Sequence, residues 1–95
     1  MYKIELANSA AKELEKIYLA DQKLYSRLIA VIESLPSDPF QGKKLKGQLK
    51  GDFSIRVGHY RIIYSVHKEK LIIYIIALLS KLVSLRAFFA KQSHS

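Results

Sequence analysis

The clearest pattern of hydrophobic and polar residues runs from Phe53 to Val66, and it predicts a β-hairpin. Apolar residues alternate with polar ones on both sides of Gly58-His59, which is the period of a strand with one buried face. Most of these apolar residues are β-branched or aromatic, as strands favour. A glycine in the first position of a two-residue loop fits a type II′ turn. We therefore predict two antiparallel strands joined at Gly58 and His59.

The predicted turn determines which residues of the hairpin lie opposite each other. It gives three cross-strand pairs, which are Val57 with Tyr60, Arg56 with Arg61, and Ile55 with Ile62. Because cross-strand partners share a face, six residues point to one side, namely Phe53, Ile55, Val57, Tyr60, Ile62 and Tyr64. Arg56 and Arg61 then lie side by side on the other face, where like charges destabilise a sheet. Two interpretations are open. The first is a pair of arginines on a solvated face, stacked or paired with Asp52, and the second is a site for an anion.

A strand and two helices are predicted before this hairpin. Residues 1–6 alternate apolar and polar side chains, which is typical of a strand with one buried face. Asn8 is a suitable N-cap for a helix over Ser9–Leu19, and Asp21 caps a second helix that ends before Pro36. Each helix has one apolar stripe, formed by Ala10, Ala11, Leu14, Ile17 and Tyr18 and by Leu24, Leu28, Val31, Ile32 and Leu35. We expect an αα-hairpin whose stripes pack on the apolar face of the sheet.

The segment from Ser37 to Asp52 is predicted to be a loop, because glycines and proline interrupt it. Leu45 and Leu49 are its expected anchors in the core. Four lysines lie close together in it, which are Lys43, Lys44, Lys46 and Lys50. They form either a solvated basic loop or an arm that contacts phosphates and leads into the arginine pair.

After the hairpin, Leu71–Leu79 is continuously apolar and is predicted to be a central strand buried on both faces. The period then changes to a helical stripe, made of Leu78, Leu82, Leu85 and Phe89, which predicts a C-terminal amphipathic helix. Leu71–Ala90 is long enough to cross a membrane, but Lys81 and Arg86 interrupt it. Because such charges are costly inside a bilayer, we predict no membrane association.

Composition limits the classes of protein to which the chain can belong. Its 95 residues predict a single domain, 1–95, in which residues 78–95 form the distinct tail. The formal net charge of +8 suits a polyanion, a membrane surface or an acidic protein partner. The absence of cysteine excludes disulfides, thiolate metal sites and cysteine nucleophiles. The three histidines are scattered and indicate no metal site. The N-terminus lacks the apolar run of a signal peptide, so we expect a cytoplasmic protein.

Two stretches of sequence resemble a known family. KKLKGQLKGDFSIRVGHYRIIYSV is similar to the central signature of the RelE/ParE superfamily of toxins from type II toxin–antitoxin modules, and YKIELANSAAKELEKI resembles the opening strand and first helix of that family. The resemblance covers residues 2–77. It implies an α+β, RelE-like fold in which an N-terminal strand and an αα-hairpin precede an antiparallel sheet of about four strands. The predicted C-terminal amphipathic helix follows this sheet.

The resemblance also implies an activity and partners. RelE-like members cut messenger RNA on the ribosome, whereas ParE-like members inhibit DNA gyrase. If the chain is an endonuclease, Arg56 and Arg61 match catalytic positions of the family, and Arg61 would contact the scissile phosphate. The expected RNA-binding residues are Lys43, Lys44, Lys46, Lys50, Ser54 and Lys81. The implied partners are a cognate antitoxin and ribosome-bound mRNA, with assembly as a homodimer or a toxin–antitoxin hetero-oligomer. Cleavage through the 2′-hydroxyl would need no metal or cofactor.

The chain departs from the family after Ala77. Family members carry a further arginine or histidine and a tyrosine in this region, whereas the matching positions here, Leu79 to Leu85, contain neither the arginine nor the tyrosine. We therefore expect a RelE-like endonuclease attenuated by its altered tail. A ParE-like gyrase inhibitor and a non-toxic relic that still binds an antitoxin are the alternatives. His59 is the only nearby group that titrates close to neutrality, and it is either an acid–base group or an exposed turn residue.

Overall fold

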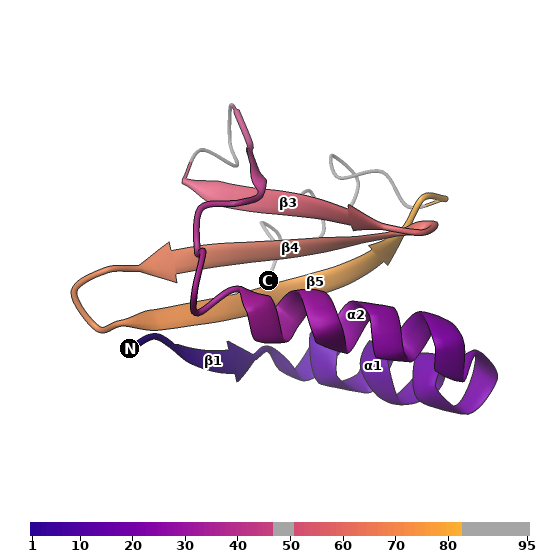
Figure 1. The fold of residues 1–95 in the computed structure, drawn as a ribbon. Helices are drawn as coiled ribbons and strands as arrows, with labels where there is room; N and C mark the ends of the chain where they lie inside the picture. Colours follow the sequence, from indigo (N-terminus) through magenta and orange to yellow (C-terminus); the bar gives the residue numbers. More distant parts are fainter. Residues whose placement is uncertain (47–50, 83–95) are drawn as a thin grey trace.

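The computed structural model describes residues 1–46 and 51–82, which form one five-stranded sheet with two helices on one face (Figure 1). The elements in chain order are β1 (Lys3–Leu6), α1 (Asn8–Ala20), α2 (Gln22–Ser34), β2 (Lys43–Lys44), β3 (Asp52–Val57), β4 (Tyr60–His67) and β5 (Ile72–Ser80). The strand order is β1-β5-β4-β3-β2. The predicted α+β class and helical pair are confirmed.

The sheet is mixed, so the prediction of an antiparallel sheet of about four strands was wrong in two respects. First, β1 pairs with β5 in parallel, and the backbone bonds Lys3 N–H to Leu71 C=O and Ala7 N–H to Ile75 C=O flank this ladder at 2.8 and 2.9 Å. Second, Lys43 and Lys44 form the short strand β2 in the segment predicted to be a loop. Alternation indicates which face of a strand is buried, but it does not indicate the partner strand.

The hairpin of β3 and β4 has the predicted register. Val57 pairs with Tyr60, Arg56 with Arg61 and Ile55 with Ile62. Gly58 has a φ of +60°, and His59 is not among the described residues with positive φ, as a type II′ turn requires. The six residues predicted to share a face belong to the main core or pack against it.

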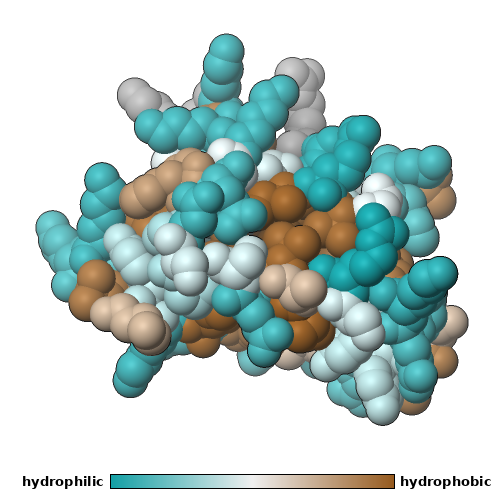
Figure 2. Space-filling model, viewed as in Figure 1, coloured by the Kyte–Doolittle hydropathy of each residue, from teal (hydrophilic) through white to brown (hydrophobic). Residues whose placement is uncertain are grey.

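The helices begin and pack mostly as their apolar stripes predict. Most residues of the two stripes are buried in the main core, namely Ala10, Leu14, Ile17, Leu24, Leu28, Ile32 and Leu35. Val31 is partly buried and packs against this core. The side chain of Asp21 caps α2, since its Oδ1 accepts from the amide of Leu24 at 3.0 Å. Ala11 and Tyr18 are exposed, contrary to the prediction. Figure 2 shows apolar surface in the middle of this side of the molecule, bordered by hydrophilic side chains.

The predicted cap at Asn8 was wrong, because Asn8 is already the first residue of α1. Ala7 occupies the N-cap position, and no side chain caps this end. The Ala7 amide donates to Ile75 in β5, and its carbonyl accepts from Ala11. The chain therefore passes directly from the edge of the sheet into the helix.

Strand β5 contains a bulge that explains its continuous apolar sequence. Ile63 pairs with Ala77 and Tyr64 pairs with Ile75, so Ile76 is an extra residue between them. Because of this insertion, Ile73, Ile75 and Leu78 belong to the main core, whereas Ala77 and Leu79 belong to a second cluster with Ile63. From Ala77 to Leu79 the strand is buried on both faces, as predicted, whereas Leu71 is exposed and Ile72 and Tyr74 are only half-buried.

The C-terminal helix was predicted to include Leu78, but Leu78 is a buried strand residue opposite Ile62. Leu82 lies after the strand and is 89% exposed. Leu85, Phe89 and the rest of the predicted helix lie outside the described residues. Among the described residues, no helix is long and apolar enough to cross a membrane.

The segment between α2 and β3 is attached to the sheet through Tyr64. This tyrosine is fully buried, its hydroxyl donates to the Pro39 carbonyl at 2.9 Å, and it accepts from the Gly42 amide at 3.0 Å. A Cβ atom on Gly42 would lie 2.8 Å from that hydroxyl, so the contact requires glycine. Leu45 packs on the second cluster as an anchor, whereas Leu49 lies outside the described residues.

Candidate functional site

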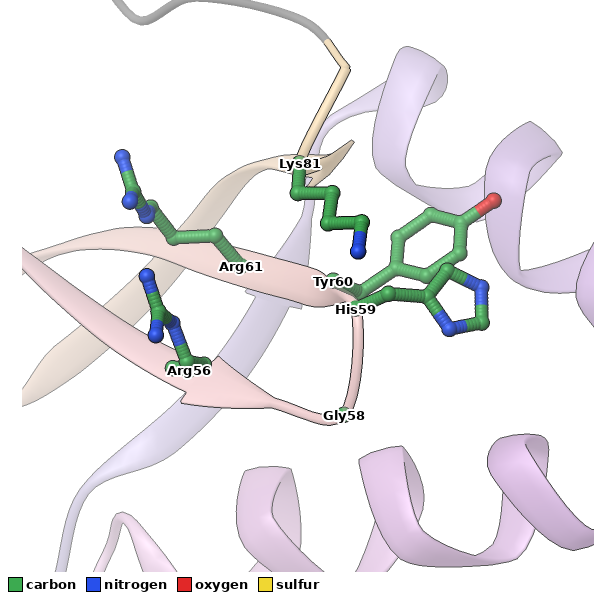
Figure 3. A pocket seen from close by; sticks show the side chains of 6 residues that line it. All are labelled: Arg56, Gly58, His59, Tyr60, Arg61 and Lys81. Carbon is green, nitrogen blue, oxygen red and sulfur yellow. The ribbon is translucent and has the colours of Figure 1, made fainter.

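Arg56 and Arg61, called the arginine pair below, lie directly opposite each other on the sheet face away from the helices. Their side chains extend side by side (Figure 3). Arg56 is exposed and Arg61 is half-buried. Each guanidinium offers five donors in a rigid fork, which matches phosphate and carboxylate oxygens. The hairpin register thus places two anion-binding groups at one position of the sheet.

The arginine pair borders a hollow of about 340 Å³ at the Gly58-His59 turn, which we call the turn hollow. Its described lining residues are Arg56, Gly58, His59, Tyr60, Arg61 and Lys81 (Figure 3). They include three cations and no carboxylate. The backbone amide of Lys81 donates to the carbonyl of His59 at 2.8 Å, which holds the end of β5 beside the turn. The turn hollow therefore concentrates positive charge from β3, from β4 and from the residue that follows β5.

Asp52 does not neutralise the arginine pair. It pairs with Ser65 across the hairpin, four residues before Arg56 on the same strand, or roughly 13 Å away at the usual strand rise. Burial raises the pKa of the Asp52 carboxyl above its ordinary value, and the nearby His67 lowers it in part. Pairing of these arginines with Asp52 is therefore wrong, and a solvated, stacked pair and an anion site are the two interpretations that are left.

The predicted RNA-binding residues divide between the two faces of the sheet. Lys43 pairs with Ser54, and both lie on the face of the arginine pair, whereas Lys44 pairs with Phe53 on the helix side. Lys46 is exposed and follows Leu45. Lys50 lies outside the described residues. The structure therefore brings Lys43, Ser54 and Lys81 toward the arginine pair and directs Lys44 away from it.

His59 is exposed at the turn, as one of its two interpretations required. Its ring lies beside that of Tyr60, with the ring centroids 5.1 Å apart. The Tyr60 hydroxyl donates to Oε2 of Glu13 at 2.9 Å, and burial together with this bond raises the Tyr60 pKa. Glu13 and Tyr60 are 47 positions apart, so no local sequence pattern could have predicted this contact.

An N-terminal strand followed by two helices and a mixed sheet of five strands is the RelE-like fold. Residues 4–82 match the family described as the ParE toxin of the type II toxin–antitoxin system parDE. The chain therefore belongs to this family and is a toxin of the RelE/ParE superfamily. The match extends five residues beyond Ala77, where the predicted resemblance ended.

Solved structures of related toxins have the same fold. The isolated E. coli RelE toxin is 20% identical, with a TM-score of 0.74 and coverage of 100% of both chains. A chain of the RelBE2 toxin–antitoxin complex of Mycobacterium tuberculosis is 25% identical, with a TM-score of 0.73, and 83% of this chain and 96% of that one are covered. The YoeB/ParE toxin of Agrobacterium tumefaciens is 22% identical, with a TM-score of 0.75 and corresponding coverages of 82% and 96%. No curated protein sequence matches the chain.

Proposed function

We propose that this toxin is a RelE-like, ribosome-dependent mRNA endonuclease whose cleavage is attenuated by its altered C-terminal tail. The turn hollow is the main support, because its three cations suit an RNA phosphate. Arg56 and Arg61 would stabilise the charge that develops on the non-bridging phosphate oxygens. Lys43, Ser54 and Lys81 would contact neighbouring parts of the strand.

The proposed reaction is attack of a 2′-hydroxyl on the adjacent phosphate, which gives a cyclic phosphate and a free 5′-hydroxyl. A positioned donor pair supplies electrostatic stabilisation, whereas proton transfer needs a separate acid and base. General acid–base catalysis contributes about 10²–10⁴-fold to such a rate. The side chains of Leu79 and Ser80 contain no group that titrates near neutrality, so these two positions supply neither the acid nor the base. We therefore expect the toxin to bind an RNA phosphate well but to cleave the RNA slowly.

We propose an acidic or amphipathic antitoxin as the protein partner, because the chain has a formal net charge of +8. Related toxins support a paired arrangement, since YoeB of Staphylococcus aureus has been crystallised with YefM and as a dimer. The proposed place of action is the cytoplasm, where ribosome-bound mRNA would be the substrate.

Induction of the toxin in bacteria tests the proposed activity. We expect weak growth arrest with reduced protein synthesis and mRNA cut within ribosomes. Replacing residues 78–95 with a family-like ending should strengthen the arrest, and Arg61→Ala should suppress it. Strong arrest by the unaltered chain would contradict attenuation, and intact mRNA together with a DNA-damage response would contradict cleavage.

Salt titration of RNA binding tests the phosphate site directly. For single strands the slope of log K against log salt is about −0.7 per neutralised phosphate. Because the arginine pair is proposed to bind one phosphate, replacing both arginines with alanine should make the slope shallower by about 0.7. Replacing Lys68 and Lys70 with alanine is a suitable control, because it also removes two charges, from exposed lysines on the turn between β4 and β5, at the other end of the hairpin (Figure 1). An equal change of slope in both variants would show that net charge alone binds the RNA.

Gyrase inhibition is the alternative activity, and the description of the matched family as ParE toxins favours it. A DNA supercoiling assay with purified gyrase separates the two activities. Inhibition of supercoiling at toxin concentrations that leave translation intact would favour the ParE-like function. Activity in neither assay, with an antitoxin still bound, would indicate a non-toxic relic.

A further inference from the structure

A second hollow adjoins the turn hollow on the side of the helices. It has a volume of about 270 Å³ and is lined by Glu13, Lys16, Ile17, Ala20, Asp21, Leu24, His59 and Tyr60. His59 and Tyr60 also line the turn hollow, so the two hollows meet at the turn. We call the second one the helix-side hollow. In Figure 3 the arginine pair extends to one side, and the rings of His59 and Tyr60 extend to the other.

The helix-side hollow combines flat, apolar and hydrogen-bonding groups in a small space. The rings of His59 and Tyr60 can stack on a planar group, and Ile17 and Leu24 are buried apolar residues of its wall. Its volume is just below the range of about 300–1,000 Å³ that is typical of sites for drug-sized ligands. The space therefore suits one nucleobase better than a longer segment of chain.

Glu13 gives this hollow a specific acceptor. Its Oε2 accepts from Tyr60, and a carboxylate with two oxygens can accept further bonds. The Watson–Crick edge of guanine presents two adjacent N–H donors, from the ring nitrogen and the exocyclic amine, that a carboxylate can accept together. Adenine and cytosine present one amino group beside an acceptor, and an acceptor facing a carboxylate is unfavourable.

We propose that the helix-side hollow binds a guanine base of the RNA whose neighbouring phosphate is bound by the arginine pair, with Glu13 as the residue that selects the base. This inference rests on the proposed RNA binding and adds base specificity to it. A ribose would bridge the two hollows at Tyr60. The contact between Glu13 and Tyr60 orients the carboxylate, and Lys16 lies on the same wall, where it can contact a flanking phosphate.

The test measures binding of labelled uridine heptamers with one central variable base, by fluorescence anisotropy at fixed salt. The central base is guanine, hypoxanthine, adenine or cytosine. We expect guanine to bind more tightly than adenine or cytosine by about 5- to 150-fold, the range of a good bidentate contact. Hypoxanthine keeps the ring donor but lacks the exocyclic amine, so its affinity should be intermediate. Glu13→Gln should remove most of this preference.

Two control variants separate recognition from charge and from folding. Glu15→Gln removes the same charge from an exposed position of α1 and should raise the affinity for all four heptamers without changing their order. Tyr60→Phe removes the hydroxyl that contacts Glu13 but keeps the aromatic ring. If Glu13 contacts the base, Tyr60→Phe retains most of the guanine preference. If Glu13 only positions Tyr60, then Glu13→Gln and Tyr60→Phe lose the preference equally. Thermal unfolding confirms that each variant is folded.

The outcomes distinguish this inference from the proposed function. Loss of the guanine preference in Glu13→Gln, with its retention in Glu15→Gln and Tyr60→Phe, supports base selection by Glu13. Equal binding of all four heptamers, or a preference that persists in Glu13→Gln, overturns base selection and leaves RNA binding intact. Failure of every heptamer to bind at low salt overturns both proposals.

Discussion

The variant Tyr64→Phe, which lacks one hydroxyl group, should be less stable, because that hydroxyl connects the sheet to the segment between α2 and β3. In the native structure it donates to the Pro39 carbonyl at 2.9 Å and accepts from the Gly42 amide at 3.0 Å. The ring is fully buried and stacks on Phe53, with ring centroids 5.3 Å apart and planes 18° from parallel. Phenylalanine keeps this stacking and removes only the two hydrogen bonds.

The expected cost follows from those two bonds. Each intramolecular hydrogen bond contributes about 0.5–1.5 kcal/mol net, so the pair contributes about 1–3 kcal/mol. Gly42 lies so close that a Cβ atom there would be 2.8 Å from the hydroxyl, which leaves little room for a replacing water molecule. We therefore expect a loss of about 2 kcal/mol in the free energy of unfolding. For a domain of this size that loss lowers the melting temperature by about 8–16 °C.

Thermal and urea unfolding measure this loss, and hydrogen exchange locates it. The Gly42 amide should exchange faster in Tyr64→Phe, because its acceptor is gone. Tyr18→Phe is the matched control, since Tyr18 is 47% exposed and surface changes usually shift stability by less than about 0.5 kcal/mol. Equal melting temperatures for the two variants would refute the role given to the Tyr64 hydroxyl.

Two further predictions concern the turn and the tyrosines. Gly58→Ala should lower the urea midpoint, because a φ of +60° at this turn position strains a residue that has a side chain by about 1–3 kcal/mol. An unchanged midpoint would contradict the turn assignment. Burial raises the pKa of Tyr60 and of Tyr64, so above pH 10 the unfolded chain loses these protons before the folded chain does. The free energy of unfolding should therefore fall as the pH rises above about 10, and it should fall less steeply in Tyr64→Phe, which chemical denaturation at pH 8 and pH 11 would measure.

The elements that follow from local periodicity were predictable from the sequence. The alternation around Gly58 gave the hairpin and its register, and the apolar stripes gave both helices. The arginine pair followed from the same register, since opposite residues on a hairpin share a face. These predictions depend on residues that are close in sequence.

The wrong predictions concern contacts between distant segments. Nothing near residues 3–6 indicates that β5 is their parallel partner. The bulge at Ile76 breaks the alternation of β5, so Leu78 resembled the start of a helical stripe, whereas it pairs with Ile62 in the sheet. Pairing with a neighbouring strand here overrides the local period.

The same distinction applies to the site. The cations of the turn hollow were predicted because the hairpin and the end of β5 contain them, although their meeting depends on the bond between Lys81 and His59. The helix-side hollow was not predicted, because Glu13 reaches Tyr60 only when α1 packs on the sheet. A search for carboxylates on the helix stripe that faces the turn could have suggested it.

The proposed phosphate binding and the proton transfer that cleavage requires depend on different segments of this chain. The register of Arg56 and Arg61 is set by the turn at Gly58, and Lys81 is held there by its own backbone amide, so the described groups of the turn hollow are in place by the end of β5. The positions expected to lack the basic residue and the tyrosine of the family begin at Leu79, whose side chain contributes to the second cluster. In the proposed endonuclease, a change of tail would therefore remove acid–base catalysis while it leaves the fold and the proposed anion site intact. RNA affinity and cleavage rate should consequently respond separately to substitutions in the hairpin and to replacement of the tail.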